Sequence, residues 1–169
     1  MNRFASLIDR LGYEPRRIAK LRLLTEYFRE TPDPERGWAL AALTGALSFR
    51  HAKPGLIRGL IQERTDPVLF ALSYDYVGDL AETVALMWPA GAGAGDAPRL
   101  SDVVAGLQQT TKVDLPAQLA RWLDSLDETG RWALLKLITG QMRIGASARL
   151  AKTAVARLGT LEPNAVELV

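Results

Sequence analysis

The segment from Arg131 to Thr160 contains basic residues and no Asp or Glu. The whole chain has a net charge of only +2, so this local excess of positive charge stands out. Clustered Lys and Arg side chains raise the local positive potential and attract polyanions. The segment therefore predicts a surface for a polyanion, made by its six cations: Arg131, Lys136, Arg143, Arg149, Lys152 and Arg157.

The spacing within this segment indicates an amphipathic helix beginning at Ser147. With about 100° of rotation per residue, Leu150, Ala154 and Leu158 fall on one side of such a helix. The basic residues Arg149, Lys152 and Arg157 fall on the other side. We expect the apolar side to dock on a central helix and the basic side to face solvent or a polyanion.

The start of the same helix suggests a second way to bind anions. The residues at this helix start, Gly145, Ala146 and Ser147, are all small. Free backbone N–H groups and the helix dipole at such a position favour the binding of a phosphate. Gly145 would let a phosphate approach the main chain, and Arg143 could add a bidentate contact. This combination suits a sugar–phosphate backbone, whose contacts position a protein without reading sequence. A solvated helix face, preceded by an ordinary C-cap at Gly140, a turn and an N-cap, remains the alternative.

Two further basic clusters precede this segment. Arg50, His51 and Lys53, followed by Arg58 and Arg64, lie around a predicted loop that could meet phosphates or only increase solubility. His51 is the only histidine, and no partner for a metal site or an acid–base pair is evident near it. The other cluster is a candidate for a third contact or for an interdomain surface and consists of Arg10, Arg16, Arg17, Lys20 and Arg22.

No catalytic centre emerges from the sequence. The chain lacks cysteine, which excludes a disulfide framework, a thiolate zinc site and a cysteine nucleophile. It also lacks the G-x-x-x-x-G-K-[ST] phosphate loop, the G-x-G-x-x-G fingerprint and a K-x-D-G motif. The carboxylates gather at predicted helix starts, where capping explains them: Asp75, Asp79, Glu82, Asp124, Asp127 and Glu128.

Helical periodicity runs through almost the whole chain, and its 169 residues suit one domain. We predict an all-α, irregular domain of about ten helices, in halves 1–88 and 100–169 joined by a Gly/Ala/Pro linker at 89–99. The third helix should span about 34–48, the fifth should end near Phe70, and Ser101 should cap the next one. A strongly apolar helix from Asp127 to Gly140 should occupy the centre of the second half. A last helix should begin at Pro163.

Neither a bilayer-spanning run, which takes ~20 apolar residues, nor a signal peptide is present in the sequence. We therefore expect a cytoplasmic protein that does not bind membranes.

The segment GQMRIGASARLAKTAVA, residues 140–156, resembles part of the N-terminal DNA-binding domain of ATP-dependent DNA ligases. There a central apolar helix ends in a glycine, followed by an R-[IL]-G turn and a helix start rich in small residues. DETGRWALLKLITG at 127–140 and the G-D helix start at Gly78-Asp79-Leu80 also fit. With GWALAALTGALSFRHAKPGLIRGLI in its first half, the chain resembles the bacterial branch over residues 1 to about 165.

The resemblance implies a helical domain lying against the minor groove of nicked duplex DNA in repair or nick sealing. The R-[IL]-G turn would supply backbone contacts from Gly140, Arg143, Gly145 and Ser147. At Gln141 some relatives carry a basic residue, and that charge is missing here.

The catalytic lysine of such ligases lies in a nucleotidyltransferase domain, which with an OB domain would follow beyond Val169. We therefore expect a monomeric, nucleoid-associated excised domain without cofactors or enzyme activity, whose partners are nicked DNA and the catalytic domains of the same polypeptide. ATP and Mg²⁺ would belong to the parent ligase. The alternative is a helical protein-interaction module that uses its basic face on an acidic partner. A small stand-alone enzyme would need an acid–base set that the sequence lacks.

Overall fold

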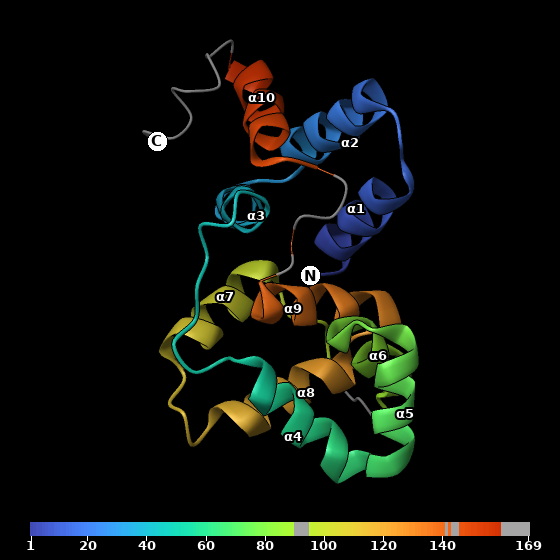
Figure 1. Cartoon of the computed structure of the whole chain (residues 1–169). Helices are drawn as coiled ribbons and strands as arrows, with labels where there is room; N and C mark the ends of the chain where they lie inside the picture. Colours follow the sequence, from blue (N-terminus) through green and yellow to red (C-terminus); the bar gives the residue numbers. More distant parts are fainter. Residues whose placement is uncertain (90–94, 141, 143–145, 160–169) are drawn as a thin grey trace.

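The computed structural model describes residues 1–89, 95–140, 142 and 146–159, and within them the chain forms ten α-helices and no strand (Figure 1). This confirms the all-α prediction. None of the described helices combines the length and apolar character needed to cross a membrane. The helices are α1 (Asn2–Tyr13), α2 (Arg17–Glu30), α3 (Glu35–Leu43), α4 (Pro54–Arg64), α5 (Pro67–Val77), α6 (Leu80–Met87), α7 (Leu100–Gln109), α8 (Leu115–Ser125), α9 (Glu128–Thr139) and α10 (Ala148–Gly159).

Helix α9 is buried, as its apolar sequence predicted, but it lies at the centre of the whole fold rather than of the second half alone. It packs against α1, α4 and α6, and its residues from Ala133 to Ile138 are all buried. Local signals set its ends. The Asp127 carboxylate accepts a hydrogen bond from the Gly130 N–H at 2.8 Å, and Gly140 adopts a left-handed φ of 74° that stops the helix.

The packing of the helices does not follow their order in the chain. Helix α10 packs on α2 and α3, α3 packs on α7, and α1 bridges α2 and α9 (Figure 1). The expectation that α10 docks on the central helix was therefore wrong. The surface of α9 is covered by α1, α4 and α6, so the apolar side of α10, with Leu150, Ala151 and Ala154 buried, packs against α2 instead.

Three predicted helix boundaries also needed correction. Helix α3 ends at Leu43 rather than near 48, because Gly45 turns the chain with a φ of 75°. Helix α5 continues past Phe70 to Val77 and ends at Gly78, whose φ is 76°. Helix α7 begins at Leu100, so Ser101 is not its cap and instead donates a hydrogen bond to Glu35. The helix expected from Pro163 lies outside the described residues.

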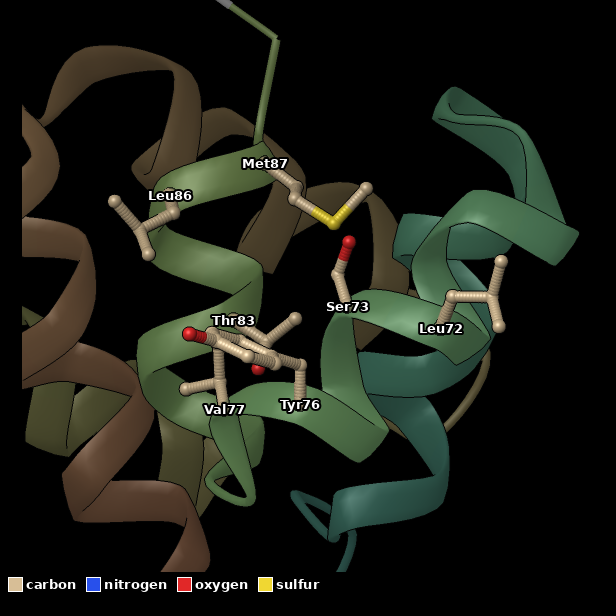
Figure 2. Close-up of a pocket in the computed structure, with 7 residues that line it drawn as sticks. All are labelled: Leu72, Ser73, Tyr76, Val77, Thr83, Leu86 and Met87. Atoms are coloured by element: carbon tan, nitrogen blue, oxygen red, sulfur yellow. The ribbon is translucent and has the colours of Figure 1, made fainter.

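The longer α5 has a consequence for the surface. Phe70 is the buried side chain of this helix, whereas Leu72 and Tyr76 are exposed. In Figure 2, Tyr76 points toward α6 and Leu72 points away from it.

Helix α2 is held on α1 by aromatic side chains. The rings of Tyr27 and Phe28 meet edge to face with their centroids 5.7 Å apart, and Phe4 of α1 lies 6.4 Å from Tyr27. Burial raises the pKa of Tyr27 to about 12, so its phenol is neutral at physiological pH. These contacts fix one side of α2 in the core and leave its polar side outward.

Candidate nucleic-acid interface

The junction between α9 and α10 has the capping geometry that the sequence predicted at both ends. Gly140 is exposed and left-handed at the end of α9. Ser147 caps α10, because its Oγ accepts a hydrogen bond from the Leu150 N–H at 3.1 Å. The buried side chains of Met142 and Ala146 anchor the connection between the two helices. The predicted contacts Gln141, Arg143 and Gly145 lie outside the residues that the structure describes.

Helix α10 sorts its residues into an apolar side and a basic side. Leu150, Ala151 and Ala154 are buried, whereas Arg149 and Arg157 are exposed. Neither arginine side chain forms a hydrogen bond or an ion pair with the part of the chain that the structure describes. Lys152 is half-buried at the edge of this side. No acidic residue occurs in α10, so nothing on the helix offsets its positive charge.

The fold places a second basic helix against α10. Helix α2 carries Arg17, Lys20 and Arg22 of the basic cluster that begins at Arg10 in the sequence, and Arg17 and Arg22 are exposed. Arg16 differs, because its Nε donates to Glu14 Oε1 at 3.0 Å. This hydrogen bond lowers the pKa of Glu14, and the pair is neutral overall. Arg22 also lines a hollow between α1 and α2 that contains Asp9, Glu14 and Glu26. Below, the α2–α10 surface means the exposed arginines of two packed helices, Arg17 and Arg22 of α2 and Arg149 and Arg157 of α10.

The loop between α3 and α4 presents fewer free charges than its sequence suggested. Arg50 and Lys53 are exposed, and His51 is half-buried between the buried residues Phe49 and Ala52. Farther along, the Arg58 guanidinium lies 5.5 Å from the centre of the Tyr74 ring. That of Arg64 lies 4.8 Å from the Trp88 ring and also donates to the Leu60 carbonyl. Arg50 and Lys53 therefore remain the candidate phosphate contacts of this loop.

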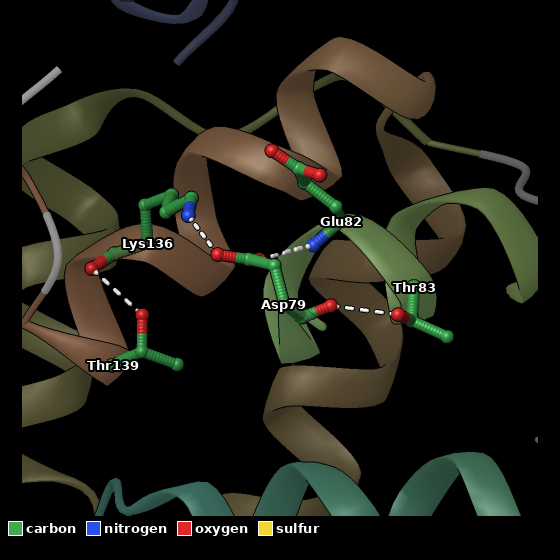
Figure 3. A network of polar contacts seen from close by, with 5 residues as sticks. All are labelled: Asp79, Glu82, Thr83, Lys136 and Thr139. Atoms are coloured by element: carbon green, nitrogen blue, oxygen red, sulfur yellow. Dashed lines mark hydrogen bonds and ion pairs between the residues drawn. The ribbon is translucent and has the colours of Figure 1, made fainter. Parts of the chain in front are cut away.

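Lys136 and Arg131, which belong to the six cations between Arg131 and Thr160, interact with residues elsewhere in the fold. Lys136 is buried, with 6% of its surface exposed, and its Nζ lies 2.5 Å from Asp79 Oδ2 (Figure 3). The other oxygen of this carboxylate caps α6 by accepting the Glu82 N–H at 2.8 Å. Arg131 donates through Nε to the Leu123 carbonyl at 2.7 Å, at the end of α8.

The expectation of six uncompensated charges was therefore wrong for Lys136. Its partner is 57 positions earlier in the sequence, where a count along the segment does not find it.

Capping accounts for only some of the carboxylates for which the sequence predicted it. Asp75 lies within α5, and Asp124 lies within α8 and accepts a hydrogen bond from Trp88 Nε1 at 2.9 Å. Asp79 and Asp127 both accept backbone N–H groups at helix starts. In the described ranges, no three His, Asp or Glu side chains come close enough together to hold a metal ion. No protein-family model and no curated protein matches the chain.

Proposed function

We propose that this chain binds duplex DNA independently of sequence, through the sugar–phosphate backbone, as the DNA-binding domain of an ATP-dependent DNA ligase that acts on nicks. The observation that carries the proposal is the α2–α10 surface, with its four exposed arginines on two packed helices. Nucleotidyl transfer, with its ATP and Mg²⁺, is assigned to other domains of such a ligase.

The chemistry of the surface suits phosphates better than base edges. Arginine forks match phosphate oxygens and remain charged at any physiological pH. The capped start of α10 adds outward backbone N–H groups and the positive end of a helix dipole near Arg149. Contacts of this kind fix the position of a protein on a duplex and carry no sequence information.

That the DNA is nicked, and that it is bound from the minor groove, is proposed from the resemblance of residues 140–156 to ligase domains. Two parts of the resembling segment are structurally consistent with it, namely the left-handed Gly140 and the cap at Ser147.

Binding should weaken steeply with salt, because each neutralised phosphate releases counterions from the duplex. For four arginine–phosphate contacts, log K against log salt should fall with a slope of about −3.6 or steeper. Fluorescence anisotropy with labelled nicked duplex at several salt concentrations measures this slope. Two duplexes of unrelated sequence should bind with equal affinity.

The variant carrying both Arg149→Ala and Arg157→Ala should reduce the magnitude of this slope by about 2, since each lost contact removes about 0.9. The matched control replaces two exposed cations distant from α10, Lys112 between α7 and α8 and Arg121 on α8, and loses the same net charge. If both double variants lower the slope equally, the effect comes from net charge and the proposed surface is wrong. Capture of an acidic protein that survives nuclease treatment, without DNA binding at low salt, would favour the interaction-module alternative.

A further inference from the structure

Helix α5 presents an apolar side that nothing in the described structure covers. Leu72 is 63% exposed and Tyr76 is 94% exposed, and Val68 and Leu69 near the start of the helix are also exposed. Single exposed apolar residues are normal on protein surfaces, but a contiguous group usually marks a site of interaction.

This apolar side borders one hollow, and a second hollow lies on the other side of α6. The first, of about 350 Å³, lies between α5 and α6, where Tyr76 and Met87 line opposite sides (Figure 2). The second, of about 420 Å³, is lined by Tyr13 of α1 and Trp132 of α9. Leu86, which is 60% exposed, lines both, so the two hollows are neighbours on either side of this side chain. Together we call the two hollows the α5–α6 groove.

The groove is negatively charged. Asp9, Glu82 and Glu128 line the second hollow, and no Lys or Arg is among the residues lining either one. These three carboxylates form no ion pair with any residue in the described ranges. A polyanion would be repelled here, whereas a cation on a partner would gain an uncompensated carboxylate.

We propose that the α5–α6 groove docks a basic amphipathic helix of a partner protein. Apolar side chains at i, i+3 or i+4, and i+7 of that helix would enter the two hollows, as in helix-in-groove recognition. Its flanking Lys and Arg side chains would face Asp9, Glu82 and Glu128. Charge complementarity selects this occupant over an acidic or neutral helix. The proposal is independent of DNA binding, because none of the four arginines of the α2–α10 surface lines the groove.

A second copy of the chain fits the groove less well. The exposed basic part of α2 offers Ile18, which is 77% exposed, as a single apolar anchor between Arg17 and Arg22. Such a head-to-tail contact would also join unlike surfaces and would leave both ends of the assembly open to further copies.

The test uses a synthetic helical peptide with three leucines at helical spacing, flanked by lysines, and a second peptide with glutamates in place of the lysines. Titration of the whole chain by fluorescence anisotropy should give saturable, micromolar binding of the lysine peptide. Binding of the glutamate peptide should be at least tenfold weaker. The variant Leu86→Ser should bind the lysine peptide at least tenfold more weakly than the native chain does. The pair Glu82→Gln and Glu128→Gln should remove most of the preference for lysine.

The control is Val113→Ser, which changes an apolar side chain that is 87% exposed between α7 and α8 and should leave binding unchanged. Circular dichroism checks that each variant is folded. Equal affinity for the two peptides, no effect of Leu86→Ser, or no saturable binding would overturn the proposal. Sedimentation that shows self-association abolished by Leu86→Ser would also overturn it, by assigning the groove to a second copy.

Discussion

Replacing Lys136 with methionine should lower the free energy of unfolding by about 3 kcal/mol. Methionine preserves much of the side-chain length but leaves the Asp79 carboxylate without its cation. The side chain of Asp79 is only 20% exposed, and the Lys136 ammonium 2.5 Å away is the cation that offsets its charge (Figure 3). Urea denaturation of the variant and of the native chain measures the loss.

Two further variants make this prediction specific. Combining Lys136→Met with Asp79→Asn removes both charges while keeping a residue that can cap α6, so it should cost less than the single change. Lys112→Met, at an exposed position, should stay within about 0.5 kcal/mol of the native chain. A Lys136→Met variant no less stable than Lys112→Met would contradict a structural role for the pair.

The Lys136→Met variant also distinguishes a structural role of Lys136 from a role in binding DNA. Where it remains folded, Lys136→Met should leave the salt dependence of DNA binding unchanged, because Lys136 is buried against Asp79. A reduced slope would return Lys136 to the contact surface that the sequence alone suggested.

Replacing Gly106 with alanine should destabilise the fold by about 2 kcal/mol, although alanine favours helices over glycine. A β-carbon at this position of α7 would lie 2.4 Å from Cη2 and 2.7 Å from Cζ2 of Trp122. The Trp122 ring is rigid and buried, so either the indole or α7 must move. Urea denaturation again measures the change.

Gly59→Ala in α4 is the matched control, since nothing lies within 4 Å of a β-carbon there. It gains the same helix propensity without a clash and should stabilise the chain by about 0.5–1 kcal/mol. If Gly106→Ala stabilises the chain to the same degree, Trp122 does not occupy the position described.

Local signals allowed much of the fold to be predicted from the sequence. Asp79 and Asp127 precede apolar helical spacing, and each caps the helix that follows. The apolar run before Gly140 similarly identified the buried central helix, because caps and periodicity depend on neighbouring residues alone.

Tertiary contacts were not predictable in the same way. The partner of Lys136 is distant in sequence, and the packing of α10 on α2 depends on which surface of α9 remains uncovered. The candidate site changed accordingly. Lys136 is buried and no longer belongs to the candidate site, whereas the arginines of α2 now do. The spacing of residues along the chain does not indicate that α2 packs beside the helix of Arg149.

We propose that duplex DNA contacts this chain on the α2–α10 surface. The most direct test is the titration of the ¹⁵N-labelled chain with nicked duplex, followed through its amide chemical shifts. We expect the largest shifts from Ser147 to Leu150 and along α2 around Arg17 and Arg22. These shifts should become smaller as salt is added, and the amides of α5 should not shift. Shifts centred on the α5–α6 groove would contradict the assignment of DNA to the α2–α10 surface. DNA binding without shifts in α2 or at the start of α10 would contradict it as well.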